Sequence, residues 1–272
     1  MTVMKIFISA ALISIFVFVA VSANAGPYED GVGAYERKDY VTAAKLMRVA
    51  AEQGDSFAQS ILGVMYVNGQ GVIQDYKEAV KWYRLSADQG YASAQYNLGL
   101  IYAQGQGVTQ DYKEAVKWYR LSADQGNAKA QTNLGLMYDN GQGVTQDYKE
   151  AVKWFRLSAH QGNAKAQTNL GLMYEDGQGV IKDHKEAVKW YRLSADQGNA
   201  TAQSNLGAMY ANGKAVTQDY VRAHMWLNIS ASSGDKNAES NRDIVAKKMS
   251  QTQIEKAQEL SLIHISERTR PY

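Results

Sequence analysis

Hydrophobic residues in the stretch 91–126 follow the spacing of an α-helix. Ala94, Leu98, Ile101 and Tyr102 fall at i, i+4, i+7 and i+8, which places them on one face of a helix. The pattern therefore predicts a first helix in this stretch.

Two glycines end this helix and an aspartate begins another. Gly105 and Gly107 interrupt the pattern, as expected where the backbone must reach a positive φ. Asp111 can cap free N–H groups at the start of a second helix, and Glu114 follows three residues later as in a capping box. Gly126 ends the second helix. Its packing stripe consists of Ala115, Trp118, Tyr119 and Ser122.

This pair of helices recurs every 36 residues along the chain. The period is kept by Gly63, Gly99, Gly135, Gly171 and Gly207 and by Trp82, Trp118, Trp154, Trp190 and Trp226. A fixed period of this length predicts a solenoid, because a single helix pair cannot bury its apolar faces alone. The predicted units are 27–54, which is shorter and lacks the long turn, then 55–90, 91–126, 127–162, 163–198 and 199–234.

Both ends of the array differ from the repeat. After Gly234, residues 235–260 predict one or two capping helices, over 235–249 and 251–260. The last stretch, 261–272, shows no helical stripe and no relation to the repeat. Its sequence SLIHISERTRPY resembles translated adaptor read-through, so whether it is native is left open and we assign it no structure or function.

The first 25 residues have the features of an export signal. Lys5 precedes an apolar run over 6–21, and Ala23-Asn24-Ala25 is a cleavage site for a signal peptide over 1–25. We therefore expect an exported chain, periplasmic or secreted. An uncleaved anchor is the alternative, and it is the only membrane attachment that we expect.

Composition narrows the function further. The chain has no cysteine, which excludes disulfides, thiolate metal sites and cysteine nucleophiles. The net charge of +2 is too balanced to indicate nucleic acid as a partner. We expect a monomer.

The repeated pattern resembles a known family. Residues 94–126 read A-x-x-x-L-G-x-x-Y-x-x-G-x-G-V-x-x-D-x-x-x-A-x-x-W-Y-x-x-x-A-x-x-G, which is similar to the Sel1-like repeat, a relative of the tetratricopeptide repeat. The likeness is close over 55–234 and looser over 27–54. The fifth full copy departs from it at Lys214 and Ala215, and its segment DYVRAHMWLNISASSG resembles the last repeat of bacterial members. The resemblance implies an all-α fold, a right-handed α-solenoid of stacked antiparallel helix pairs with a C-terminal capping helix.

The sequence gives no constellation for catalysis, a metal or a cofactor. The four histidines, which we expect to be exposed, occupy different phases of the repeat and have no recurring acidic or nucleophilic partner. The recurring aspartates and glutamates are explained by helix capping. The GQGV turns lack the lysine and the preceding strand of a phosphate-binding loop. We therefore expect a protein that is not an enzyme.

Two surfaces could bind a partner. One is a basic stripe on the second helices, exemplified by Lys113, Lys117 and Arg120, which neighbouring acids dilute. The other is the face of the first helices opposite the core. It is found by turning about 100° around the helix axis for each residue, starting from the core residue Leu98. Its three columns are Tyr96, Thr132 and Thr168, then Leu100, Leu136 and Leu172, then Ala103, Asp139 and Glu175, with an asparagine ladder of Asn97, Asn133, Asn169 and Asn205 beside them.

The leucine and asparagine columns allow two interpretations. They form a groove that grips an extended peptide by apolar contacts and amide donors, as the concave face of tetratricopeptide-like arrays does. Alternatively, the leucines pack against the next repeat and the asparagines brace turns between repeats.

Together these features favour a non-catalytic scaffold or adaptor that binds a protein or peptide partner along its first helices. The alternative function is a cell-wall protein that binds peptidoglycan fragments or hydrolyses β-lactams, as described for some exported relatives. Those relatives are rich in cysteine, and this chain has neither cysteine nor an S-x-x-K motif in its repeats.

Overall fold

The computed structural model describes residues 26–269, and that part of the chain is all-α, with fourteen helices and no strand. It divides into two compact units, a first that ends at Asp111 and a second that begins at Tyr112. No helix in the described part is long and apolar enough to span a bilayer. The predicted signal peptide, 1–25, lies outside the described residues.

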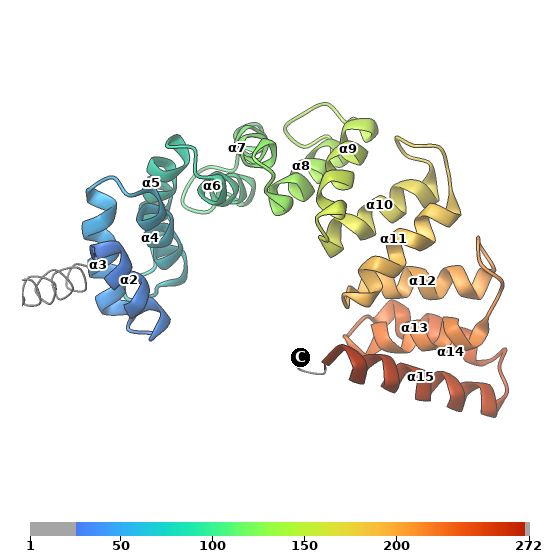
Figure 1. Ribbon diagram of the computed structural model, residues 1–272. Coiled ribbons are helices and arrows are strands. Elements are labelled where there is room, and N and C mark those ends of the chain that lie inside the picture. The colour runs from blue at the N-terminus through green and yellow to red at the C-terminus, as the bar shows by residue number, and fades with distance from the viewer. Residues whose placement is uncertain (1–25, 270–272) are drawn as a thin grey trace, which may run out of the picture. The chain divides into compact units, whose positions relative to one another are not determined.

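The first unit contains two antiparallel helix pairs followed by one further helix (Figure 1). Its helices are α2 (Pro27–Glu36), α3 (Tyr40–Glu52), α4 (Ser56–Asn68), α5 (Tyr76–Asp88) and α6 (Ala92–Gln104).

The second unit continues the same alternation and ends in two additional helices. Its helices are α7 (Tyr112–Asp124), α8 (Ala128–Asn140), α9 (Tyr148–His160), α10 (Ala164–Asp176), α11 (His184–Asp196), α12 (Ala200–Asn212), α13 (Tyr220–Ser232), α14 (Lys236–Ala246) and α15 (Gln251–Thr269). The predicted all-α class with helix pairs in tandem is confirmed.

In each full repeat, a glycine ends the first helix and an aspartate precedes the second. The carboxylate of Asp147 accepts hydrogen bonds from the backbone N–H groups of Lys149 and Glu150 at 2.9 and 3.1 Å, which caps α9. At the start of the same turn, α8 stops at Gly141, whose φ of +66° lies in the left-handed region. The predicted roles of the recurring aspartates and turn glycines are therefore confirmed.

Within a pair, a glycine lets the two helices approach closely. A Cβ atom on Gly135 of α8 would lie 2.7 Å from the ring of Phe155 on α9, and one on Gly171 would lie 2.6 Å from the ring of Tyr191. The Oγ atoms of Thr132 and Ser158 lie 2.8 Å apart on the same pair. From Thr132 to Gly135 the chain moves forward along α8, while their contacts on α9 move back from Ser158 to Phe155. The two helices are therefore antiparallel.

Successive pairs are joined by apolar and polar contacts. One core cluster combines Phe155 of α9 with Leu170 and Met173 of α10 and with Trp190 of α11. The Gln167 side chain of α10 donates a hydrogen bond of 3.1 Å to the carbonyl of Ala159 near the end of α9. Each helix pair therefore buries its faces mainly against its neighbours, as expected for repeats.

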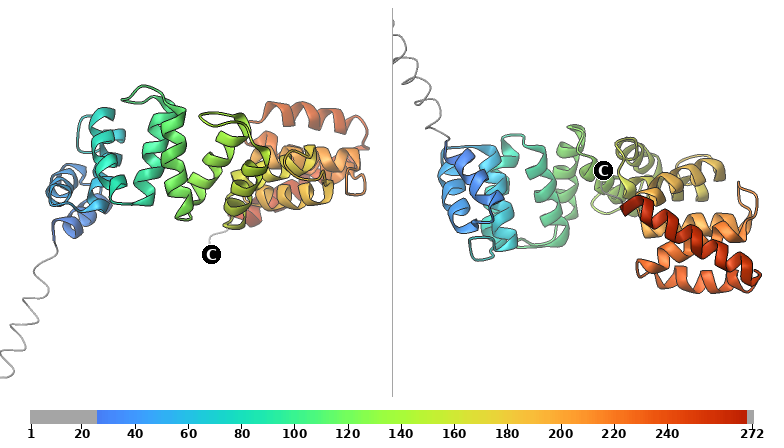
Figure 2. Two further views of the ribbon diagram at one scale, coloured as in Figure 1. Left: turned by 90° about the horizontal axis from the view of Figure 1, so that it is seen from above. Right: turned by 60° about the horizontal axis from the view of Figure 1, so that its bottom comes forward.

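The end of the chain corrects the sequence analysis. Residues 261–269, for which no structure was predicted, continue α15. Ser261 is 1% exposed, and its hydroxyl donates to the carbonyl of Ala257 at 2.8 Å. The ring centroids of His264 and Trp226 lie 4.8 Å apart in an edge-to-face arrangement. The prediction was wrong because small or polar residues, Ala257, Ser261 and His264, share the packed face of this helix with the half-buried Ile265, which hides the apolar stripe. Figure 2 shows α15 running beside α13.

One turn of the second unit carries an unusual backbone conformation. Ala215 has a φ of +60°, at the position where the preceding turns have Gly143 and Gly179 with φ of +72° and +69°. Its side chain is exposed, so the methyl group contributes little burial to compensate for the strained backbone. The left-handed region costs an L-residue other than glycine about 1–2 kcal/mol of conformational free energy.

We expect Ala215→Gly to stabilise the protein by about 0.5–1 kcal/mol, because relief of the strain exceeds the added entropy of glycine in the unfolded chain. Thermal melts followed by circular dichroism measure the effect. Ala211→Gly is the matched control, since Ala211 lies inside α12 and glycine there should lower stability by about 0.5–1 kcal/mol. A loss of stability with both variants would contradict the assignment of strain to Ala215.

Candidate functional site

The predicted groove residues lie on the first helix of each pair, but they divide between the two units. Tyr96, Asn97 and Leu100 lie on α6 of the first unit, and all three are half-buried. The remaining candidates lie on α8, α10 and α12 of the second unit. The second unit therefore holds three successive first helices on which the predicted face can be compared.

The exposure predicted for the two threonines was wrong. Thr132 is 3% exposed and Thr168 is 4% exposed. The Thr132 hydroxyl donates to the carbonyl of Ala128 at 2.9 Å, and the Oγ atoms of Thr168 and Ser194 lie 2.8 Å apart. The reason is the close approach of the paired helix at Gly135, which covers the face that the helical wheel placed outward.

The leucines of the second column are half-buried between repeats. Leu136 packs against the core cluster of α9 and α10, and Leu172 packs against the cluster formed by the last repeats. The packing interpretation is thus confirmed for one side of each of these two side chains. The rest of each side chain remains open to solvent, because neither leucine is fully buried.

The asparagine ladder is half-buried as well, but its members differ. The side-chain nitrogens of Asn169 and Asn205 are enclosed without a hydrogen-bond partner. Burial raises the pKa of Tyr191, whereas Asn205, which lies beside the Tyr191 hydroxyl, acts to lower it. Asn133 makes no side-chain hydrogen bond to the described residues, and its amide is not enclosed. Asn133 is therefore the ladder member on α8 that remains free to bind a ligand.

The third column, which was not singled out as a site, contains two acids in different settings. Glu175 accepts a hydrogen bond of 2.9 Å from the Tyr191 hydroxyl and lies 3.5 Å from the ammonium of Lys214. Asp139 is half-buried and has neither a hydrogen bond nor an ion pair from its carboxylate to the described residues. Burial alone raises the pKa of Asp139 above its ordinary value. The change from Ala103 to Asp139 in otherwise similar repeats was the signal in the sequence.

The basic stripe on the second helices is partly paired within the protein. Lys153 pairs with Glu150 at 3.2 Å and Lys189 pairs with Glu186 at 3.3 Å, each one turn away on the same helix. Arg156 donates to the hydroxyl of Tyr174 in the next repeat at 2.9 Å. Exposed ion pairs of this kind contribute about 0–1 kcal/mol each. The Tyr174 hydroxyl is neutral, so its hydrogen bond leaves the charge of Arg156 in place.

Titratable groups elsewhere form no reactive cluster in the described part of the chain, where no group of three potential metal ligands occurs. His224 was expected to be exposed, but it is 3% exposed on α13, because its position corresponds to the buried Val188 one repeat earlier. Burial lowers the pKa of His224, and the nearby Arg242 lowers it further.

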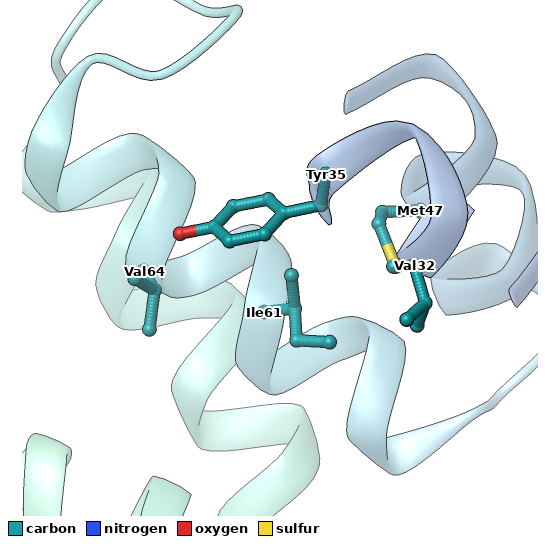
Figure 3. A pocket seen from close by; sticks show the side chains of 5 residues that line it. All are labelled: Val32, Tyr35, Met47, Ile61 and Val64. Carbon is teal, nitrogen blue, oxygen red and sulfur yellow. The ribbon is translucent and has the colours of Figure 1, made fainter. Parts of the chain in front are cut away.

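A small apolar cavity lies in the first unit. It has a volume of about 270 Å³ and lies between α2, α3 and α4 (Figure 3). The lining consists of Val32, Tyr35, Met47, Ile61 and Val64. The Tyr35 hydroxyl donates to the side-chain oxygen of Gln70 at 3.0 Å, so the polar atom of the lining is already satisfied. The cavity offers apolar contact without a polar group to orient a ligand.

We expect Leu136→Asp to lower the stability of the protein by about 2 kcal/mol or more, because the carboxylate would lie against an apolar cluster without a partner. Thermal denaturation followed by circular dichroism measures this loss. Leu157→Asp serves as the matched control, since Leu157 is 45% exposed on α9 and should change stability by about 0.5 kcal/mol or less. Equal melting temperatures for the two variants would show that Leu136 does not pack between repeats.

Comparisons with known proteins agree with this geometry. The sequence matches the family model described as Sel1 repeat six times in succession, over 23–55, 56–91, 92–127, 128–163, 164–199 and 200–235. A Sel1 repeat protein from Oxalobacter formigenes is 33% identical, with a TM-score of 0.79 over 91% of this chain and 98% of that one. No curated protein matches the chain significantly.

A second similar structure is c5321, a protective antigen present in uropathogenic Escherichia coli strains that displays an SLR fold. It is 37% identical with a TM-score of 0.79, and the match covers 89% of this chain and 53% of that one. The chain therefore spans about half of the length of c5321.

Proposed function

Since six Sel1 repeats account for most of its length, the chain belongs to the Sel1 repeat family, and we propose that it is an exported scaffold that binds an extended segment of a protein partner. Sel1 repeat proteins generally act as protein-interaction scaffolds, and the fold is typically non-catalytic. The binding surface in this proposal is the open face of the first helices, centred on α8.

The observation that carries the proposal is the state of Asn133 and Leu136 on α8. Both are half-buried, so each presents a partly fixed side chain to solvent. The amide of Asn133 can both donate and accept, and no described residue satisfies it. An apolar contact flanked by a free amide suits an extended peptide, whose backbone offers matching donors and acceptors.

The other asparagines explain why the proposal centres on α8. The side-chain nitrogens of Asn169 on α10 and Asn205 on α12 are enclosed, so a peptide would not reach them without rearrangement. Leu172 and Ala208 on these helices are half-buried and can continue the apolar contact. The surface therefore offers a polar centre on α8 and mainly shape beyond it.

We expect Asn133→Ala to weaken capture of a protein partner from a periplasmic extract. The free energy of binding should become less favourable by about 1–3 kcal/mol, because the amide pairs with a peptide group of the partner. The measurement is quantitative mass spectrometry of proteins retained by the immobilised chain. Asn237→Ala, a change of an exposed asparagine on α14, is the control and should retain the partner fully. Equal retention by both variants would exclude α8 as the binding surface.

Export is tested separately. The apolar run and the Ala23-Asn24-Ala25 sequence motivate cleavage after Ala25. Intact mass of the protein recovered from a periplasmic fraction should correspond to a chain that starts at Gly26. Recovery of the uncleaved chain from membranes alone would contradict export in this form.

A further inference from the structure

We propose that Asp139 on α8 binds a basic side chain of the partner, a lysine ammonium or an arginine guanidinium. The proposal rests on the proposed function, because it names the chemistry of the segment that the same surface would hold. It adds a specific charge to a site that is otherwise defined by apolar contact and one amide.

The first reason is the isolation of the Asp139 carboxylate. The side chain is half-buried, and no described residue gives it a hydrogen bond or an ion pair. Neither of its oxygens is enclosed, so both can be reached from solvent. Asp139 lies one turn from Leu136, three residues along α8, and both therefore belong to the same open face.

The second reason is a template within the same unit. The helices α8 and α10 are identical over their first eleven residues, and Glu175 occupies on α10 the position of Asp139 on α8. Glu175 has two partners: it accepts from the Tyr191 hydroxyl at 2.9 Å and lies 3.5 Å from the Lys214 ammonium. A carboxylate at this position is thus placed to meet a phenol from the paired helix and a cation from outside the pair.

Both partners are missing at Asp139 because of two residue changes. Phe155 stands where Tyr191 stands one repeat later, and its ring takes the same place against the glycine of the paired helix. Gln178 stands where Lys214 stands, in the turn of the following repeat. The template therefore predicts what is lacking, which is a hydrogen-bond donor and a positive charge.

Such an arrangement is costly for folding, which indicates a role outside the fold. A partly buried carboxylate without a partner destabilises the native state, and its raised pKa reflects the same loss of hydration. Burial is the cause of this pKa shift, and no described residue forms an ion pair with the Asp139 carboxylate. A carboxylate that is partly buried, has a shifted pKa and has no partner within the protein is a candidate for a functional site.

A basic side chain meets the requirements of the site. A carboxylate only accepts hydrogen bonds, so the ligand atom must donate, and a charged donor gives a shorter and stronger bond than a neutral one. The ammonium of Lys214 at Glu175 shows that a lysine can reach this position. The apolar stem of a lysine or arginine can also lie against the open side of Leu136.

The test selects binders from a random dodecapeptide library displayed on phage, with the purified protein as bait. When the peptides recovered by the wild-type protein are aligned on their apolar residues, one position should be enriched in lysine or arginine. The enrichment should disappear with Asp139→Asn. It should also disappear with Gln178→Lys and weaken with Phe155→Tyr, because these variants supply the internal partners that Glu175 has.

Two controls separate charge and folding from binding. Asp176→Asn removes an exposed carboxylate from α10 and should keep the enrichment, which excludes general attraction of cations. Circular dichroism melts should show that all variants remain folded. Recovery of no peptide above background by the wild-type protein would overturn the proposed function itself, whereas recovered peptides without a basic position, or with one that survives Asp139→Asn, would overturn only the role of Asp139.

A synthetic peptide from the selected pool gives the affinity directly. Replacing its basic residue with norleucine should weaken binding to the wild-type protein about ten- to hundredfold, the range for one hydrogen bond to a charged group. The same replacement should change binding to the Asp139→Asn variant by less than about twofold, because the two changes remove one interaction. Equal losses in both proteins would show that the basic residue contacts another group.

Discussion

The close contact between a glycine of one helix and an aromatic ring of its partner determines much of this structure. Gly135 admits the ring of Phe155 and Gly171 admits that of Tyr191, at distances where a Cβ atom could not remain. The contact draws the paired helices together, and this buries Thr132 and Thr168 beneath them. It also fixes where the para position of the ring lies, so a tyrosine delivers its hydroxyl to the acidic position of the first helix.

Polar contacts then give each repeat a defined place on its neighbour. The Gln167 side chain satisfies a carbonyl near the end of α9, and Arg156 reaches Tyr174 in the next repeat. The last carbonyls of a helix have no hydrogen-bond partner within that helix. A side chain that donates to one of them joins two repeats and also removes the free-energy cost of an unpaired carbonyl. The same kind of contact occupies Arg156 and Arg192 of the basic stripe, which donate to the hydroxyls of Tyr174 and Tyr210.

Sequence alone predicted the helices, their caps and their turns, because glycine spacing and capping aspartates act within a few residues. It failed where burial depends on a second helix. A helical wheel places Thr132 opposite Leu134, but the wheel contains no information on how closely α9 approaches at Gly135. The helix after residue 260 was missed for a related reason, since Ala257 and Ser261 pack well because they are small.

The candidate site was only partly predictable. Asn133 and Leu136 were found by their period. Asp139 differs from Glu175 because the residues 16 and 39 positions later, Phe155 and Gln178, cannot act as its partners as Tyr191 and Lys214 do for Glu175. No pattern along α8 reveals such a lack. Only the pairing of Glu175 with Tyr191 and Lys214 shows which residues would have supplied it.

Near-identical repeats have a geometric ambiguity that the carboxylate of Asp139 removes. On a surface where each repeat offers the same contacts, an extended ligand can shift by one repeat and meet an equivalent set of groups, so no single alignment is favoured. One repeat with an unneutralised acid breaks that translational symmetry. A partner with a single basic residue would then have one preferred register and one polarity along the array, although the scaffold beneath it is almost periodic.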